Sequence, residues 1–591
     1  MLRSPLFMTH LFQALRKFLR NDQLILAMLS LFIGLLGGGL VIVLRESISF
    51  FQWNFYGAPG ERLYEIVAAL PWWQVLAVPT LGGLAVGVLI HRGLPDGRGQ
   101  GVADVIEASA LKGGRMSLST GLRAAVVNAL SIGCGASVGR EGPAVHLGAS
   151  LAGWFAKHLH LSRSVSRTLL GCGVAAAVAG SFNAPIAGAL FANEVVIGHY
   201  ALKAFAPVVI ASVTGTALSR AYFGDYPAFV LPPHEITSYW EFPAFILLGV
   251  LAGLVASVLL RTIFAAQDLS HKVPGPAWIR PGIGGFLVGM IALFLPQVLG
   301  VGYGITDDAL GGSVALWLLV AVLVGKIAAT GLSLGFGFGG GIFSPSLVVG
   351  AMLGGAFGII ATDIFPTLQA GTGGYTLIGM GAVAAATLGA PISTTLIVFE
   401  LTGDYELTMG LMLAVVVSTG ITRQISGSSF FSLQLERRGL DLKGGFESGL
   451  LRASRVCDVM EEEAERVLPN VHLSQLRVFL QNSKRGELFV IDDDDRLIGT
   501  ITLADLSETA FDPAMDLLIN AADVVRRRPP VLQCNDHLED ALKKMRDSGE
   551  SLIAVVDDLD SRKFLGAVEE KHVMAAYNRA LLQSRAEEHD D

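Results

Sequence analysis

The stretch Gly139-Arg140-Glu141-Gly142-Pro143 decides how the rest of the chain is interpreted. It places two charged residues inside a long apolar region and follows them with Pro143, a residue that favours the first turn of a helix. A helix beginning at Pro143 would direct its unpaired backbone N–H groups and the positive end of its dipole at the preceding turn. Such a helix start is an anion site, and Glu141 would lie beside it as a built-in anion.

The composition is that of a membrane protein with a more polar tail. Of the 591 residues, 52% are hydrophobic and 16% are charged, whereas soluble proteins carry roughly a quarter of charged residues. Long apolar segments dominate from about Leu24 to about Arg423, and the net charge of −8 comes largely from the part after Arg437. Nothing provides the basic face that nucleic-acid binding requires. We therefore expect a membrane protein rather than an enzyme or a nucleic-acid-binding protein.

The N-terminus predicts a retained first span. Basic residues in segment 1–23 precede the apolar run Leu24–Leu44, which is too long for the core of a signal peptide. Because positive charge flanks the cytoplasmic end of a span, we expect segment 1–23 in the cytoplasm. The mixed segment Ser47–Pro71 is typical of a connection in the membrane interface.

The four cysteines predict neither a disulfide nor a metal centre. They are Cys134, Cys172, Cys457 and Cys534, and their spacing is neither paired nor typical of metal ligands. The first two lie in apolar segments, where we expect small core residues. We expect no metal site and no required cofactor.

Later apolar segments are short and interrupted. Pieces such as Leu169–Ala179 and Phe205–Ala217 alternate with glycine-rich breaks, and many are too short to cross a hydrocarbon core of about 30 Å alone. Broken backbone at that depth persists only when it is buried in protein or lines a wet cavity. The 70 glycines fit short helices that pack closely.

An internal repeat relates two parts of the apolar region. Ala184–Glu194 matches Ala390–Glu400, with Ala, Pro, Ile, Leu and Glu at the same steps. A second match begins at Pro143 and at Pro345 with nearly the same offset. Duplication with interrupted helices at corresponding positions indicates a binding site near the membrane midplane, between the repeats. We expect a transmembrane domain over 24–436, with repeats at about 70–220 and 240–435.

The tail predicts two small α+β modules. In each, an amphipathic helix precedes a β-hairpin, and Gly499 of the first hairpin matches Gly566 of the second. We expect a linker at 437–453, modules at 454–512 and 520–580, and an acidic tail at 581–591.

Three motifs resemble those of the CLC family of chloride channels and chloride/proton antiporters. Gly139–Pro143 matches the glutamate-bearing motif, and Gly341-Ile342-Phe343-Ser344-Pro345 matches the second anion-site motif. Gly99-Gln100-Gly101-Val102-Ala103-Asp104 is similar to the first motif, which usually reads Gly-Ser-Gly-Ile-Pro-Glu. The tail resembles the paired CBS domains of some members. The resemblance implies an α-helical polytopic membrane protein with the CLC fold, an inverted repeat of short tilted helices, and a cytoplasmic α+β CBS pair.

The resemblance also implies gated transport of chloride and similar monovalent anions through a lipid bilayer. Glu141 would be the gate, because its carboxylate competes with chloride for the donors at the helix starts. The residues expected around chloride are Gln100, Gly101, Gly142, Ile342, Phe343 and Phe431. The resemblance further implies a homodimer, and we expect a multi-pass protein of the inner or plasma membrane with both termini in the cytoplasm.

Two departures from the family bear on anion contacts. Gln100 replaces the usual coordinating serine; its amide can donate a hydrogen bond but is bulkier. An alternative alignment through Gly97-Arg98-Gly99 would put Arg98 there, although Val102-Ala103-Asp104 favours Gln100. Phe431 stands where the family has a tyrosine, so the hydroxyl donor is lost.

A third departure bears on coupling. In proton-coupled members two adjacent acids end the Ala-Pro helix, and the second relays protons; here the pair reads Glu194-Val195. Valine carries no proton, and channel members typically have valine there. The proton-relay position is therefore lost at Val195, which favours passive anion flow, with the antiporter as the alternative. Glu194, matched by Glu400, is expected to be structural.

Other polar residues carry open alternatives. Lys326, inside an apolar run, is either functional, or paired or snorkelling, and His146 is expected to pack in the core. In the tail, Thr502 and Asp505 fit the CBS nucleotide signature, whereas the second module has Glu569 and His572 at those places. The CBS pair is therefore expected either to bind an adenine nucleotide at Thr502 and Asp505 or to have a structural or dimer-stabilising role.

Overall fold

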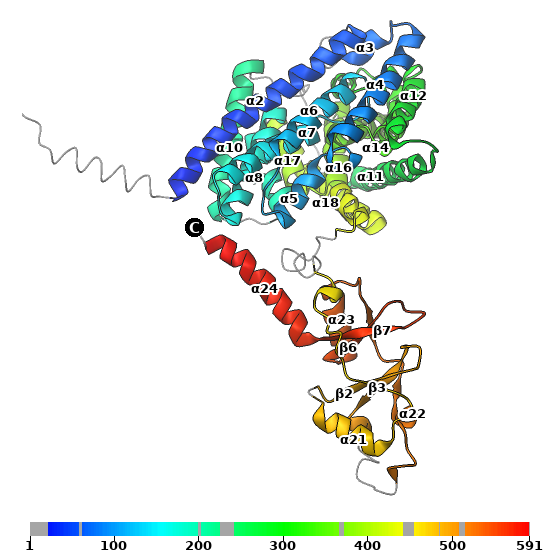
Figure 1. Cartoon of the computed structure of the whole chain (residues 1–591). Coiled ribbons are helices and arrows are strands. Elements are labelled where there is room, and N and C mark those ends of the chain that lie inside the picture. Colours follow the sequence, from blue (N-terminus) through cyan, green and yellow to red (C-terminus); the bar gives the residue numbers. More distant parts are fainter. Residues whose placement is uncertain are drawn as a thin grey trace, which may run out of the picture. The chain divides into compact units, whose positions relative to one another are not determined.

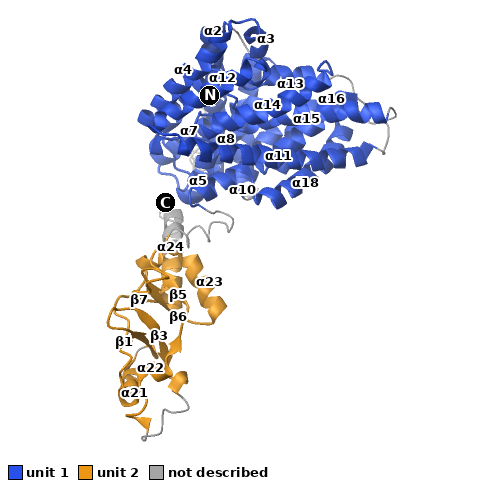
Figure 2. Cartoon of the chain, turned by 90° about the vertical axis from the view of Figure 1, so that its right-hand side faces the viewer, with its two compact units in different colours: residues 1–440 blue, residues 441–591 orange. Residues whose placement is uncertain are grey.

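Two units make up the chain in the computed structural model (Figure 2), Met1–Leu440 and Asp441–Asp591. The structure describes residues 22–57, 62–198, 202–224, 241–365, 371–440, 454–483, 485–506 and 515–589. Most of the expected N-terminal segment 1–23 and of the linker 437–453 lies outside the described residues.

The described part of the first unit consists of helices joined by short loops (Figure 1). Up to residue 223 these are α2 (Asp22–Tyr56), α3 (Leu63–Val67), α4 (Trp72–Gly93), η1 (Pro95–Gly97), α5 (Val102–Leu111), α6 (Leu118–Gly133), α7 (Glu141–His158), α8 (Arg163–Phe182), α9 (Pro185–Phe191), the π-helix η2 (Ala192–Ile197) and α10 (Leu202–Phe223). From residue 241 they are α11 (Glu241–Lys272), η3 (Ala277–Ile279), α12 (Arg280–Ala292), η4 (Pro296–Val298), α13 (Tyr303–Leu310), α14 (Leu316–Gly335), α15 (Phe343–Ile364), α16 (Gly371–Leu388), α17 (Pro391–Thr402), α18 (Tyr405–Ser426) and α19 (Phe430–Arg437).

Several helices are longer than their apolar cores suggested. Among the described residues, 8 helical segments are long and apolar enough to span a membrane. The apolar piece Leu169–Ala179 lies within α8, whose first turn is polar and is capped by the Ser162 hydroxyl. The connection expected from Ser47 is wrong as far as Tyr56, because α2 continues through it and the Ser47 hydroxyl bonds the Val43 carbonyl of its own helix.

The two Ala-Pro segments of the repeat pack against each other and cap each other. The Glu194 carboxylate accepts hydrogen bonds from the backbone N–H groups of Ile392 (3.0 Å) and Ser393 (2.8 Å) at the start of α17. The Glu400 carboxylate accepts from Ile186 (2.9 Å) and Ala187 (2.7 Å) at the start of α9. Each acid thus neutralises the orphan donors and the dipole of the opposite helix, and Glu194 has a structural role.

Glycine contacts repeat in the same way. An added Cβ at Gly148 would lie 2.4 Å from the Gly173 carbonyl oxygen, so α7 and α8 meet backbone to backbone. The corresponding Gly350 of α15 would meet Gly379 of α16 at the same 2.4 Å. Larger side chains at these positions would separate the helices, which explains why each repeat keeps glycine there.

The second unit contains two small sheets with helices. The four-stranded sheet has the order β1 (Arg466–Val467), β2 (Glu487–Ile491), β3 (Leu497–Thr502), β4 (Arg526–Arg527), and the three-stranded sheet has the order β5 (Val531–Gln533), β6 (Leu552–Val556), β7 (Phe564–Glu569). In both, a parallel pair is followed by an antiparallel hairpin. The helices are η5 (Val456–Asp458), α21 (Leu473–Asn482), η6 (Ala504–Leu506), α22 (Ala521–Val524), α23 (Leu538–Ser548) and α24 (Glu570–His589).

One sequence prediction about cysteine is wrong. Cys457 and Cys534 form a disulfide, with Cα atoms 4.8 Å apart and a sequence separation of 77. The Cys457 N–H also donates to the Cys534 carbonyl, so the backbone pairing brings the two side chains together. Cys134 and Cys172 are buried, as expected.

Replacing Glu400 by Ala should destabilise the first unit. The change leaves the N–H groups of Ile186 and Ala187 without their charged acceptor, which costs on the order of 2 kcal/mol. Thermal unfolding of the purified protein in detergent measures this as a lower Tm. Glu406→Ala, at an exposed position of α18, is the control and should change the Tm little. An equal Tm for both variants would contradict the capping role.

Candidate functional site

Two helix starts meet at the Gly139–Pro143 motif. Helix α7 begins at Glu141 with Arg140 as its N-cap, two residues earlier than the start expected at Pro143. Proline fits within the first turn because its missing N–H would have no partner there. Gly139 and Gly341 exchange two backbone hydrogen bonds of 2.6 and 2.8 Å. This bridge holds the start of α7 beside the start of α15.

The Glu141 carboxylate is buried between these helix starts. Its side chain is about 1% exposed, and the Tyr303 hydroxyl donates to Oε1 at 2.7 Å. The Ser344 hydroxyl, in the first turn of α15, donates to Oε2. Arg140 Nε lies 3.8 Å from Oε1, and the Arg140 guanidinium lies 4.9 Å from the centre of the Tyr303 ring. Two hydroxyl donors and a nearby cation offset the cost of burying this charge.

Sequence reasoning missed Tyr303 and the role of Ser344. Tyr303 begins α13 directly after Gly302, whose φ of 91° is in the left-handed region. Tyr303 is a polar side chain at a helix start beside glycines. The same pattern identified Glu141 in the sequence, and it could have identified Tyr303. Lys326 supports this loop: its buried ammonium donates to the carbonyls of Val298 (3.0 Å) and Gly300 (2.8 Å). The lysine is thus paired with backbone carbonyls.

A large cavity of about 320 Å³ lies beside the carboxylate. Its lining includes Glu141 and every residue expected around chloride, namely Gln100, Gly101, Gly142, Ile342, Phe343 and Phe431. The Phe343 ring packs against Phe182, with 4.8 Å between the ring centres. The Gln100 side chain is 7% exposed, and its Nε2 has no hydrogen-bond partner within the described part of the chain. An unpaired buried donor facing a cavity suits an anion.

A small cavity of about 190 Å³ is lined by Arg140, the residue before Glu141. Glu141 lines the large cavity, so adjacent residues of the chain face different cavities. The Arg140–Glu141 segment therefore lies between them.

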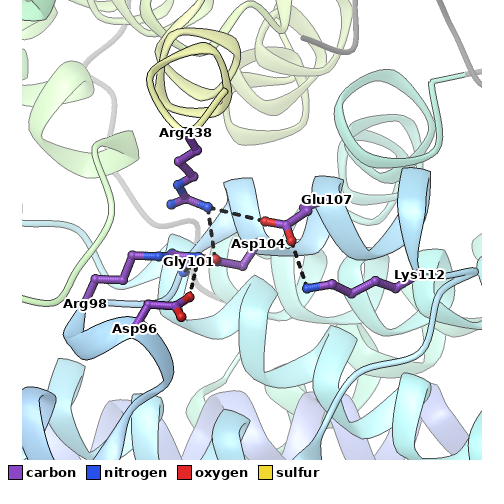
Figure 3. Close-up of polar contacts among 7 residues, drawn as sticks. All are labelled: Asp96, Arg98, Gly101, Asp104, Glu107, Lys112 and Arg438. Atoms are coloured by element: carbon purple, nitrogen blue, oxygen red, sulfur yellow. Dashed lines mark hydrogen bonds and ion pairs between the residues drawn. The ribbon is translucent and has the colours of Figure 1, made fainter. Parts of the chain in front are cut away.

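Charged residues at the start of α5 form ion pairs with Arg98 and Arg438, which line the large cavity (Figure 3). Arg438 directly follows α19. Asp104 accepts from the Gly101 N–H (2.8 Å) and forms ion pairs with Arg98 (2.6 Å) and Arg438 (3.0 Å). Arg438 also approaches Glu107. Asp104 thus orients the helix start that carries Gln100 and Gly101. Arg98 lines the same cavity, but its guanidinium is engaged by Asp104, unlike the amide nitrogen of Gln100.

Comparison with known families decides the assignment. The profile described as "Voltage gated chloride channel" matches residues 82–423, more than half of the chain. The chain belongs to the CLC family. The CBS domain profile matches residues 456–511 and 521–579. The protein is thus an integral multi-pass membrane protein of a family of chloride channels and transporters, which are not enzymes.

Relatives of the CLC family are similar over the membrane unit or more. A ClcB-like protein of Ralstonia nicotianae is 35% identical over 410 residues, 68% of this chain and 95% of that protein. The chloride channel ClcB of Escherichia coli is 30% identical over 404 residues, 68% and 96% of the two chains. Chloride channel protein CLC-f of Arabidopsis thaliana is 28% identical over 536 residues, 79% of this chain and 67% of that protein.

Solved CLC structures confirm the predicted fold class. A slow cyanobacterial Cl−/H+ antiporter aligns with a TM-score of 0.64 and 22% identity, over 70% of this chain and 97% of that one. A eukaryotic CLC transporter aligns with a TM-score of 0.61 and 18% identity, over 93% and 97%. These likenesses concern the CLC fold.

Other residues singled out by the sequence have structural surroundings. Val195 lies in η2, half-buried against the helical core. His146 is buried as expected, and its Nδ1 has no hydrogen-bond partner in the described residues. In the tail, the Asp505 carboxylate accepts from the N–H and the hydroxyl of Thr502, both at 2.7 Å.

Each CBS module has an ion pair beside the glycine of its β-hairpin. Arg526 pairs with Glu550 at 2.6 Å beside the first hairpin, and its backbone contacts Gly499. Beside the second hairpin Glu461 contacts Gly566 and pairs with Arg485, which also binds Glu569. His572 lies 3.3 Å from Glu461. The residue beside the hairpin glycine is therefore basic in the first module and acidic in the second, and each is held in an ion pair.

The stability of the second unit should fall as the pH rises toward and through neutrality. Burial, followed by the Glu550 charge, raises the pKa of Glu487 from 4.5 to about 7, and Asp505 acts in the same direction. The folded state keeps this proton at a higher pH than the unfolded state. Its stabilisation is therefore complete below about pH 4.5 and is lost as the pH rises to about 7, an effect on the order of 2–3 kcal/mol.

Glu487→Gln should remove this pH dependence and slow hydrogen exchange of β2 and β3 at pH 8 in the full-length protein. Glu463→Gln, at an exposed site, is the control. Equal exchange in wild type and Glu487→Gln at pH 8, after correction for intrinsic rates, would count against the buried acid.

Proposed function

We propose that the protein conducts chloride and similar anions passively and that Glu141 is the gate of the path. The observation that carries the proposal is the buried Glu141 carboxylate, held by the Tyr303 and Ser344 hydroxyls between two cavities. In that position the carboxylate occupies the donors that an anion would need. When it is protonated or displaced, the path opens.

The donors around the large cavity suit a partly dehydrated anion. A conducting site needs N–H and O–H groups without a full counter-charge, because tighter binding would prevent release. The starts of α5 and α15 supply backbone N–H groups near Gly101 and Phe343, the start of α7 supplies that of Gly142, and Ile342 lies at the N-cap of α15. Gln100 adds an amide donor. Phe431 lacks a hydroxyl, so chloride is held more weakly at its end.

The proposal of passive flow depends on Val195, which occupies the position of the second acid in proton-coupled members. Val195 cannot carry a proton, and the neighbouring Glu194 uses both carboxylate oxygens to cap α17. No proton relay through this pair is available. The alternative is a chloride/proton antiporter, which is what the titles of two similar solved structures name: a Cl−/H+ antiporter and a CLC-type fluoride/proton antiporter.

Membrane placement and assembly follow the resemblance. We place both termini in the cytoplasm, because basic residues precede α2. The resemblance to the family supports a homodimer in the inner or plasma membrane. The CBS pair then serves mainly to stabilise the dimer. An adenine nucleotide at Thr502 and Asp505 is the second candidate role for the pair.

Replacing Glu141 by Ala should leave the path permanently open. Chloride efflux from proteoliposomes should rise about 10-fold at neutral pH and lose its dependence on pH, because no carboxylate competes for the donors. Glu194→Gln, which keeps a capping side chain, should leave the pH dependence in place. Unchanged pH-dependent efflux in Glu141→Ala would contradict the gate assignment.

Replacing Tyr303 by Phe should make the path easier to open. The lost hydroxyl favoured the charged carboxylate over the neutral one, so half-maximal efflux should move to higher pH by up to about one unit. Tyr375→Phe removes the hydroxyl of another buried tyrosine and should leave the pH midpoint unchanged. Equal midpoints in wild type and Tyr303→Phe would exclude the hydroxyl as a holder of the closed gate.

Val195→Glu tests the missing relay. A chloride gradient across proteoliposomes should drive no proton uptake in the wild type, measured with a pH electrode. Uptake in the Val195→Glu variant would mean that the rest of the proton route is intact. Stoichiometric proton uptake by the wild type would favour the antiporter.

A further inference from the structure

The disulfide of the second unit joins two segments that are far apart in the sequence. Cys457 lies in η5, close to where the described chain of this unit begins, and Cys534 directly follows β5. The covalent loop between them contains all four strands of the first sheet. Because Cys457 belongs to the first CBS module and Cys534 to the second, the bond connects the start of one module to the other.

The segment 454–461, called the entry segment below, lies against the second module although it begins the first. The Val456 N–H donates to the Asp536 carbonyl at 2.9 Å. Glu461 and Ala567 exchange two backbone hydrogen bonds. The Val456 side chain is fully buried in a hydrophobic cluster of the second module. The disulfide adds a covalent link to these non-covalent contacts.

The two bonded cysteines are less enclosed than the other two. Cys457 and Cys534 are half-buried, whereas Cys134 and Cys172 are 0% exposed. Thiol–disulfide exchange requires a thiolate to approach a sulfur atom of the bond, so exposure helps to decide which cysteines react. The chain thus contains one pair that can exchange and two enclosed thiols that serve as internal references.

The compartment proposed for the second unit bears on the role of this bond. Disulfides are rare in the cytoplasm, because glutathione and thioredoxin-type proteins keep thiols reduced there. Those that do form in the cytoplasm are usually transient or redox-sensing, whereas permanent structural bonds belong to oxidising compartments. A bond between two half-buried cysteines of a cytoplasmic unit therefore fits a reversible role.

We propose that Cys457 and Cys534 form a reversible thiol–disulfide site, which a cytoplasmic dithiol reduces and glutathione disulfide restores. The state of the site sets how firmly the entry segment is held on the second module. The inference rests on the cytoplasmic placement in the proposed function and is independent of passive conduction.

The exchange balances in both directions. A thiolate of the dithiol attacks one sulfur atom of the bond, forms a mixed disulfide and releases the other cysteine as a thiolate. The second thiol of the dithiol then displaces the first, so the protein gains two electrons and two protons and the dithiol leaves as a disulfide. The return to the oxidised protein consumes one glutathione disulfide and yields two molecules of glutathione.

Opening the bond loosens the entry segment more than the rest of the unit. A cross-link restricts the open states of the chain, so its loss favours local opening beside it. Helix α21 packs in a different hydrophobic cluster, through Leu473, Leu476 and Leu480. Reduction should therefore speed amide hydrogen exchange of the entry segment about 10-fold or more and change that of α21 little.

Thiol trapping tests the site in the full-length protein. Purified protein in detergent would be equilibrated with mixtures of reduced and oxidised glutathione, blocked with a maleimide and analysed by mass spectrometry. The pair should convert between a disulfide and two labelled thiols without denaturant, while Cys134 and Cys172 stay unlabelled. A bond that persists in the folded protein under excess dithiothreitol would overturn the site, and so would a pair that never oxidises.

Hydrogen exchange tests whether the bond holds the entry segment. Cys457→Ser and Cys534→Ser should each show, in oxidised glutathione, the fast exchange of the reduced wild type, and dithiothreitol should not change it. Cys172→Ala removes a buried cysteine of α8 outside the pair and should keep the full response to dithiothreitol. Equal exchange of the entry segment in oxidised and reduced wild type would overturn its control by the bond.

A membrane-impermeant maleimide separates this inference from the proposed function. After reduction, the pair should be labelled in inverted membrane vesicles and not in intact cells. Labelling in intact cells would put the pair outside the cytoplasm and overturn the inference, whether or not the protein conducts chloride. Absence of passive chloride efflux together with normal thiol exchange would contradict the proposed function and leave the site intact.

Discussion

A buried carboxylate between two helix starts is the interaction on which the rest of the first unit depends. The Tyr303 and Ser344 hydroxyls and the helix dipoles offset the hydration that the buried Glu141 carboxylate loses. The Gly139–Gly341 bridge fixes the distance between the two starts. Each of these groups comes from a different part of the chain, so the site exists only once both halves have packed.

The internal repeat explains how the halves pack without a regular bundle. Glu194 and Glu400 cap each other's helices, and the contacts of Gly148 and Gly350 bring neighbouring helices to the same close approach. Helices that end inside the protein leave their N–H groups available, and that is the property an anion path needs. Symmetry of the scaffold and function of the site are thus two consequences of the same broken helices.

The sequence predicted the fold and the lining of the large cavity because those depend on short motifs. Gly101, Gly142 and Phe343 are recognisable as helix starts from glycine and proline alone. The Tyr303–Glu141 contact was missed because the two residues are 162 positions apart, and the helix start at Tyr303 does not show which acid it meets. The Cys457–Cys534 bond was missed for the same reason. The predicted helices were too short, because hydropathy marks only the apolar side chains. The backbone helix continues through polar turns to its cap.

The reversal potential tests passive conduction past Glu141 most directly. The purified protein would be placed in a planar bilayer with equal chloride on both sides and a pH gradient across it. Passive anion flow predicts a reversal potential that stays at zero when the pH gradient is changed. A reversal potential that moves with the proton gradient would contradict passive conduction and establish coupled exchange.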